Sequence, residues 1–170
     1  MLTIGHSNRP LEDFLHLLQA HGVELLVDVR TIPRSRHNPQ FNLESLPAAL
    51  AAEHIDYLHM PGLGGLRHPR KDSINTAWRN DSFRGYADYM QTPEFAHNLD
   101  ELEQLGATRT TAIMCAEAVP WRCHRSMIAD ALTARGVEVR DIMAADKAGL
   151  HKLRDFAQVQ NGRVTYPGLL

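Results

Sequence analysis

Segments with strand-like spacing and segments with helix-like spacing alternate along the chain, and this alternation limits the folds it can adopt. Short apolar runs typical of buried strands occupy residues 2–5, 24–30, 55–60, 110–115 and 137–142. Helical spacing between and after them predicts helices near residues 8–22, 43–54, 93–105 and 123–135. A strand that rejoins its sheet through a helix runs parallel to its neighbour. The sequence therefore predicts an α/β fold with a mainly parallel, five-stranded sheet and helices on both faces.

The length of 170 residues suits one domain, which we expect to span residues 1–170. A hydrophobic content of 44% is that of an ordinary globular protein. The formal net charge of −2 provides no global attraction for nucleic acid or an anionic membrane, so any anion must be bound locally. We find no apolar run of membrane-spanning length, no signal-peptide pattern and too few cysteines for a disulfide scaffold. These features predict a cytoplasmic protein that does not enter a membrane.

The stretch from residue 114 to residue 132 gathers reactive side chains where a predicted strand gives way to a helix. It contains both cysteines of the chain and four charged or titratable residues: Cys115, Cys123, Glu117, Arg122, His124 and Arg125. Open parallel sheets bind their ligands at the carboxyl ends of the strands. Polar residues follow the other predicted strands as well, so we expect one site at this edge of the sheet.

Cys115 is the candidate nucleophile of this site. A helix N-terminus and nearby arginines both stabilise a thiolate, which is the reactive form of cysteine. His124 is the candidate proton shuttle, and Glu117 is a candidate acid/base or orienting group. Cys123 could be a resolving thiol, a metal ligand or a packing residue. The residues thus favour a thiolate-dependent transferase or hydrolase, although Cys115 could instead be a small buried residue that only packs.

Arginines around the same edge favour binding of an anion. A planar guanidinium forms paired hydrogen bonds with oxyanions, and a helix N-terminus attracts them. The candidate substrate-binding residues are His6, Ser7, Arg30, Arg34, Arg36, Arg122 and Arg125. Arg30 could instead pair with Asp28, and Ser7 could cap a helix. We expect a small anionic ligand or nucleotide as partner, with nucleic acid as a weaker second class because of further arginines within residues 61–80.

Seven short motifs are spread in order over nearly the whole chain, at residues 3–7, 25–36, 63–65, 85–89, 114–117, 123–125 and 165–167. Together they resemble the domain of unknown function 488 (DUF-488) family. The resemblance implies a small bacterial or archaeal α/β domain in the cytoplasm, and it implies no particular activity.

A looser resemblance is to rhodanese-like and cysteine-phosphatase domains. It rests on the Val-Asp-Val-Arg segment that ends at Arg30, on a strand that ends in Cys115, and on a helix that opens with Arg125 and Ser126. The phosphatases place five residues between cysteine and arginine, whereas six separate Cys115 from Arg122. This spacing argues against a tight phosphate cradle and leaves sulfur transfer or another thiolate reaction open.

Two further classes of function stay open. Cys115, Cys123 and His124, with Glu117, could bind zinc or iron, and His6 or His59 could complete the site. The Cys-Ala-Glu segment is similar to that of zinc deaminases, but their further Pro-Cys-x-x-Cys motif is absent. A module that binds nucleotide or nucleic acid without catalysis would use only the arginines. The sequence specifies neither a cofactor nor an oligomeric state.

Overall fold

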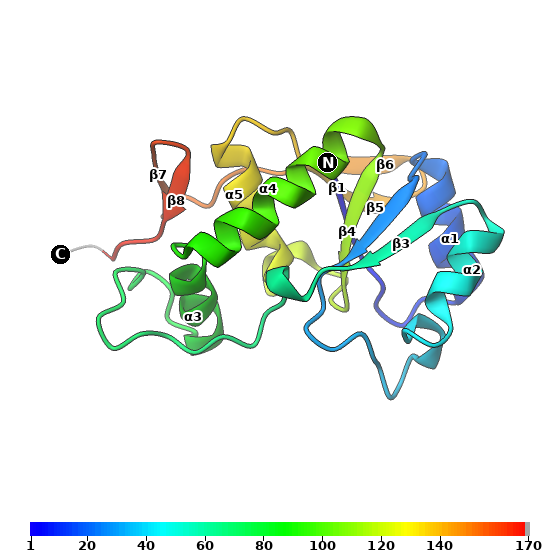
Figure 1. Cartoon of the computed structure of the whole chain (residues 1–170), viewed down its shortest axis with the longest axis horizontal. Coiled ribbons are helices and arrows are strands. Elements are labelled where there is room, and N and C mark those ends of the chain that lie inside the picture. The colour runs from blue at the N-terminus through cyan, green and yellow to red at the C-terminus, as the bar shows by residue number, and fades with distance from the viewer. Residues whose placement is uncertain (169–170) are drawn as a thin grey trace.

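Six strands form the central sheet of the computed structural model, which describes residues 1–168. They are β1 (Leu2–Gly5), β2 (Leu25–Asp28), β3 (Asp56–His59), β4 (Thr111–Cys115), β5 (Arg140–Ala144) and β6 (Lys147–Leu150). Their order in the sheet is β3-β2-β4-β1-β5-β6 (Figure 1). β1 to β5 pair in parallel, and β6 pairs antiparallel with β5. The last two residues of the expected 1–170 domain lie outside the described part.

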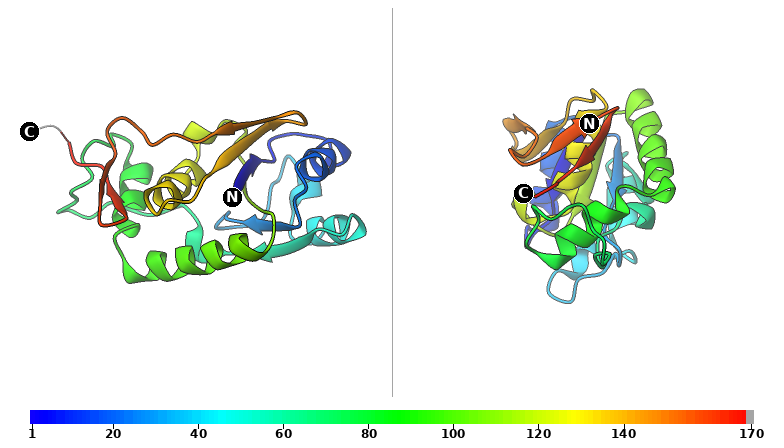
Figure 2. Two further views of the ribbon diagram at one scale, coloured as in Figure 1. Left: turned by 90° about the horizontal axis from the view of Figure 1, so that it is seen from above. Right: turned by 90° about the vertical axis from the view of Figure 1, so that its left-hand side faces the viewer.

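Five α-helices connect or flank these strands in residues 1–168: α1 (Leu11–Ala20), α2 (Leu46–Ala52), α3 (Asp81–Tyr89), α4 (Pro93–Thr108) and α5 (Arg125–Ala134). A two-stranded hairpin of β7 (Gln158–Gln160) and β8 (Arg163–Thr165) follows near the C-terminus. This hairpin lies at the end of the molecule opposite α1 and α2 (Figures 1 and 2). No helix within residues 1–168 is both long enough and apolar enough to cross a membrane.

The α/β class and the mainly parallel sheet are confirmed, but the count of five strands is wrong. β6 was missed because it is a half-exposed edge strand that mixes Lys147 with small residues, so it has no apolar run. A tight turn joins it to β5. The predicted end of a helix at Leu105 is also wrong, because α4 continues through Gly106 to Thr108.

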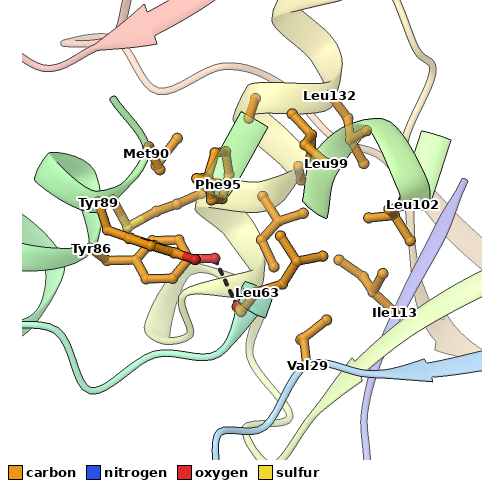
Figure 3. Packing of buried hydrophobic residues seen from close by; sticks show 14 of the residues in the cluster. Val29, Leu63, Tyr86, Tyr89, Met90, Phe95, Leu99, Leu102, Ile113 and Leu132 are labelled. Carbon is orange, nitrogen blue, oxygen red and sulfur yellow. Dashed lines mark hydrogen bonds between the residues drawn. The ribbon is translucent and has the colours of Figure 1, made fainter. Parts of the chain in front are cut away.

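The alternate residues of the central strands divide between two apolar clusters. Successive side chains of a strand point to opposite faces. In β4, Ile113 and Cys115 join a cluster that includes residues of α3, α4 and α5, whereas Ala112 and Met114 join a cluster that includes residues of α1 and α2. Figure 3 shows part of the first cluster, including the aromatic side chains of α3. Every side chain of β4 is therefore buried, which fixes the position of its carboxyl end.

Two contacts position the loops at that carboxyl end. The hydroxyl of Tyr86 in α3 donates to the Leu63 carbonyl at 2.8 Å, which holds the loop after β3 (Figure 3). Gly5 ends β1 directly beneath the loop after β4, and a methyl group on Gly5 would overlap the Glu117 carbonyl. Only glycine permits this close approach.

Candidate functional site

A pocket of about 360 Å³ opens beside the carboxyl ends of β2 and β4. Its walls come from residues within 30–34, 65–66, 82–86, 115–117 and 122–124. The structure brings seven of the sequence-predicted site residues into this lining: Arg30, Arg34, Cys115, Glu117, Arg122, Cys123 and His124. The other four, His6, Ser7, Arg36 and Arg125, do not line it.

The two cysteines are joined in a disulfide at the pocket wall. Cys115 ends β4 and is 2% exposed, and Cys123 lies just before α5 and is 6% exposed. The Nη1 group of Arg125 donates to Cys115 Sγ at 2.9 Å. The backbone N–H of Arg125, at the start of α5, approaches Cys123 Sγ at 3.5 Å. Each sulfur therefore has its own donor in addition to its bond with the other.

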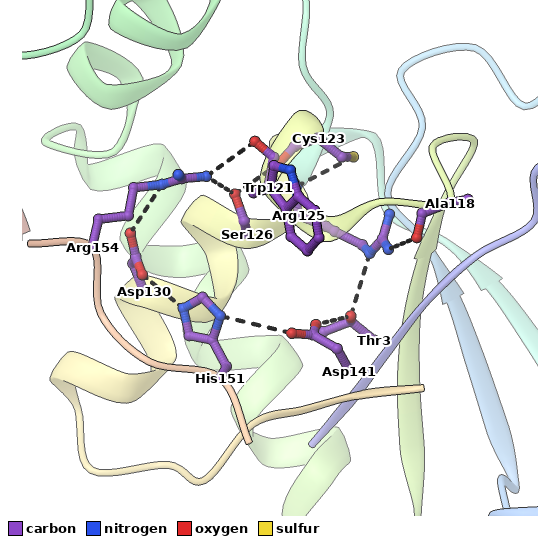
Figure 4. A network of polar contacts seen from close by, with 10 residues as sticks. All are labelled: Thr3, Ala118, Trp121, Cys123, Arg125, Ser126, Asp130, Asp141, His151 and Arg154. Carbon is purple, nitrogen blue, oxygen red and sulfur yellow. Dashed lines mark hydrogen bonds and ion pairs between the residues drawn. The ribbon is translucent and has the colours of Figure 1, made fainter. Parts of the chain in front are cut away.

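The Arg125 side chain lies behind the cysteines, and only 1% of it is exposed. It donates to Thr3 Oγ1 at 3.3 Å and to the Ala118 carbonyl at 3.1 Å (Figure 4). It also donates to the Glu117 carbonyl. Desolvation by burial lowers the pKa of Arg125 to about 10, so the guanidinium remains charged at neutral pH. Because the N–H groups of its guanidinium already donate to these acceptors, Arg125 supports Cys115 and is not placed to bind a ligand in the pocket.

A polar network continues from Arg125 toward the C-terminal segment (Figure 4). The Thr3 hydroxyl donates to Asp141, and His151 Nδ1 lies 3.9 Å from the other oxygen of Asp141. His151 Nε2 lies 2.7 Å from the buried carboxylate of Asp130 in α5. The hydroxyl of Tyr166 donates to the same carboxylate at 2.7 Å. The position of the cation behind Cys115 thus depends on contacts from both ends of the chain.

His124 lies between the pocket and the loop after β2. Its Nε2 is 3.0 Å from the Val29 carbonyl, which can only accept, so Nε2 carries the hydrogen. Its Nδ1 is then unprotonated and faces Cys123 Sγ at 3.7 Å. Burial lowers the pKa of His124 to about 4, mainly through desolvation. A ring that is neutral at pH 7 can accept a hydrogen from Cys123 through Nδ1.

Arg30 is the second buried guanidinium of this region, and it has a counter-charge. Its Nε and Nη2 donate to the two carboxylate oxygens of Asp28 at 2.9 and 2.7 Å. Its Nη1 approaches His6 Nε2 at 3.4 Å. His6 is 1% exposed and stacks on Phe41 with ring centroids 4.5 Å apart. Arg30 and His6 therefore act as internal supports of the sheet edge, the alternative that the sequence left open for Arg30.

The remaining candidates lie nearer the surface. Arg34 and Arg122 are exposed and line the pocket, and Arg34 also pairs loosely with Glu44 at 3.5 Å. Glu117 is exposed at the same mouth. Arg36 is exposed away from the lining, and Ser7 contributes its backbone N–H to the Ala116 carbonyl.

The part of the chain that the structure describes contains no group of three or more His, Cys, Asp and Glu side chains arranged to hold a metal ion. Cys115 and Cys123 contact each other, and the nearest ring, that of His124, is directed to Val29 through its other nitrogen. The expected zinc or iron ligands therefore do not converge in this conformation.

Several contributors to the site were not found from the sequence. Thr3 and Asp141 anchor Arg125, but Thr3 is 122 residues away along the chain and Asp141 lies in β5, beyond the helix that Arg125 begins. Ile32, Leu66 and Phe83 give the pocket an apolar wall. Ile32 and Leu66 are 63% and 75% exposed. The one sequence signal for this wall is that both are large apolar residues within loops rich in arginine and glycine.

The fold and the pocket define an α/β protein with a cysteine pair at the carboxyl edge of a mainly parallel sheet. The chain belongs to the family described as "Domain of unknown function DUF488", whose model matches residues 10–132. Membership confirms the resemblance seen in the sequence motifs. Neither the curated proteins nor the solved structures include a match to the chain.

Proposed function

We propose that the protein is a cysteine-dependent enzyme in which the Cys115 thiolate attacks an anionic substrate bound in the pocket. The contact of 2.9 Å between Arg125 Nη1 and Cys115 Sγ is the observation that carries this proposal. A cation at this distance favours the charged form of the sulfur.

The surroundings of Arg125 strengthen the argument. None of the ion pairs within residues 1–168 includes Arg125, and its oxygen acceptors are the Thr3 hydroxyl and two backbone carbonyls. The carboxylates of Asp141 and Glu117 raise the pKa of Arg125 from a distance, but the nearer link to Asp141 runs through the Thr3 hydroxyl, so no carboxylate of the described residues contacts the buried guanidinium directly. The thiolate of reduced Cys115 would place a negative charge in direct contact with the guanidinium. Arg30, which already has Asp28, shows how this chain otherwise pairs a buried guanidinium.

The mouth of the pocket supports an anionic substrate. Arg34 and Arg122 are the exposed cations of its lining, while Ile32, Leu66 and Phe83 provide apolar surface. The substrate that fits carries a negative group beside an apolar part. Glu117, whose carboxylate lines the pocket, is our candidate for the general acid or base that transfers a proton to or from the leaving group in a transferase or hydrolase reaction.

The disulfide is the oxidised form of the site and must be opened before Cys115 can attack. We therefore propose that the enzyme works in a reducing compartment such as the cytoplasm, where thiols maintain reduced cysteines. In the reduced form, His124 Nδ1 is placed to accept the Cys123 S–H hydrogen.

Alkylation of Cys115 by iodoacetamide tests the proposal. In the Cys123→Ser variant under reducing conditions, Cys115 is the remaining thiol, and the dependence of its rate on pH gives its pKa. We expect a pKa at least about one unit below the ordinary ~8.5. Arg125→Met should move that pKa back toward the ordinary value, whereas Arg135→Met, which removes a cation paired with Asp100 and Glu103, should not. A Cys115 pKa of ~8.5 or higher in the Cys123→Ser variant would overturn the proposal.

A further inference from the structure

We propose that Cys115 and Cys123 act as one dithiol–disulfide pair, and that the reaction is the reduction of a disulfide whose substituents carry carboxylate or similar anionic groups. This inference rests on the Cys115 thiolate and the anionic substrate of the proposed function, and it assigns a disulfide reduction in place of a transferase or hydrolase reaction.

The first support is that both sulfurs belong to the same pocket and contact each other although they come from different elements. Cys115 is held by β4 and Cys123 by the turn that begins α5. Both line the pocket, so a substrate that reaches Cys115 also leaves its adduct within reach of Cys123.

The second support is that each sulfur has a separate means of stabilising negative charge. Cys115 accepts from the Arg125 guanidinium at 2.9 Å. Cys123 lies 3.5 Å from the first backbone N–H of the ten-residue helix α5, on the positive side of the helix dipole. A disulfide that only tied two loops together would gain little from either arrangement, because a disulfide sulfur is neutral and accepts weakly. Two thiolates that form one after the other during a reaction would each be stabilised by one of these arrangements.

The reaction then follows two thiol–disulfide exchanges. The Cys115 thiolate attacks one sulfur of the substrate R–S–S–R, forms the mixed disulfide Cys115–S–S–R, and releases R–S⁻. Cys123 then loses its S–H proton to the released R–S⁻ or to solvent. Its thiolate attacks the Cys115 sulfur of this mixed disulfide, forms the Cys115–Cys123 disulfide, and releases the second R–S⁻. The substrate has gained two electrons and the cysteine pair has lost two. A dithiol reductant of the surrounding compartment opens the pair again by the same exchange.

The substrate class follows from the pocket mouth. Arg34 and Arg122 attract an anion, and the apolar side chains of Ile32, Leu66 and Phe83 suit the carbon skeleton of such a disulfide. The only carboxylate in the lining is Glu117. A cationic disulfide should gain nothing from this surface.

The probe for the test is 5,5′-dithiobis(2-nitrobenzoate), an aromatic disulfide that carries carboxylates and releases a coloured thiolate. The reduced wild-type protein should release two equivalents of the coloured thiolate per protein molecule. It should end as the Cys115–Cys123 disulfide, without an adduct in its mass spectrum. Cys123→Ser should release one equivalent and retain a mixed disulfide on Cys115. Cys115→Ser should react at least about tenfold more slowly than Cys123→Ser, because it lacks the activated thiolate.

A wild-type protein that releases one equivalent and keeps a stable adduct would overturn the inference, since Cys123 would then not resolve it. The proposed function would survive that outcome if alkylation still gives a lowered pKa for Cys115. If Cys115 of the Cys123→Ser variant is unreactive to both reagents, both proposals fail.

A separate experiment tests the substrate class. Arg122→Ala and Arg34→Ala should each slow the reaction with the anionic probe, together by about tenfold, and leave the rate with cystamine, a cationic disulfide, unchanged or higher. Arg140→Ala is the matched control, because Arg140 is also exposed but begins β5, at the amino ends of the parallel strands and away from the pocket. Equal effects of the pocket variants on both probes would overturn the assignment to anionic disulfides.

Discussion

Two buried guanidiniums with different neighbours account for much of the chemistry at the level of single residues. Arg30 faces the carboxylate of Asp28, and the hydroxyl of Tyr57 donates to the same carboxylate at 2.5 Å. Arg125 faces a cysteine sulfur and neutral oxygens. The first arrangement neutralises a charge and stabilises the end of β2. The second leaves a positive charge available to a thiolate.

His124 provides a pH-dependent prediction at this scale. Burial lowers its pKa from the ordinary 6.5 to about 4, so between these values the unfolded chain binds a proton that the folded chain does not. The free energy of unfolding should therefore fall as pH decreases from 6.5 toward 4, with His124 contributing up to about 3 kcal/mol. Urea unfolding of the wild type and His124→Gln at several pH values under reducing conditions measures this, and the variant should show a flatter profile.

Two comparisons make that result specific. His6 also has a pKa lowered by burial and adds a loss of the same sign to both proteins, so the difference between them isolates His124. His97→Gln, which changes an exposed histidine of α4 in the same way, is the matched control variant. Equal slopes for His124→Gln and the wild type would contradict a neutral, buried His124.

At the level of elements, burial can outweigh local residue preference in deciding where a helix ends. Gly106 would end a helix in isolation, yet α4 continues past it, since Leu99 and Leu102 of the same helix are anchored in the core and Met1 covers the glycine. By contrast, Gly22 follows the end of α1 with a φ of +67°, a conformation that other residues adopt only at a cost.

The two glycines should respond in opposite ways to alanine. Gly106→Ala should raise the free energy of unfolding by about 0.5–1 kcal/mol, because alanine favours a helix and only the flexible end of Met1, at 2.6 Å from the added carbon, has to move. Gly22→Ala should lower it by about 1 kcal/mol. Urea midpoints of both variants test this pair, and a loss of stability in Gly106→Ala would mean that Met1 cannot shift.

For the whole molecule, segments outside the family match complete the fold. The match covers residues 10–132, but β1 is an inner strand that pairs with β4 on one side and β5 on the other. Val164 and Tyr166 from the C-terminal segment are buried in the larger core cluster, and Tyr166 donates to Asp130 of α5.

A fragment of residues 10–132 should therefore fail to fold cooperatively. It keeps β2, β3 and β4 but leaves the buried edge of β4 without β1, and it ends inside α5. Circular dichroism with urea should show no cooperative transition for the fragment and one for the full chain. A fragment that unfolds cooperatively, with helix and strand content like that of the full chain, would show that β1 is dispensable.

The sequence by itself determined the α/β class, the parallel strands, the family and the segment that carries both cysteines, because apolar periodicity and short motifs are local properties. It could not distinguish Arg125 from Arg30, or Arg34 from Arg36, since that depends on which carboxylate, carbonyl or pocket lies beside each guanidinium. It did not predict β6, because a half-exposed edge strand has little apolar signal. The pairing of Cys115 with Cys123 and the support of Arg125 by Thr3 and Asp141 were decided by the tertiary structure alone, because desolvation and hydrogen bonding act between residues that only the folded sheet brings into contact.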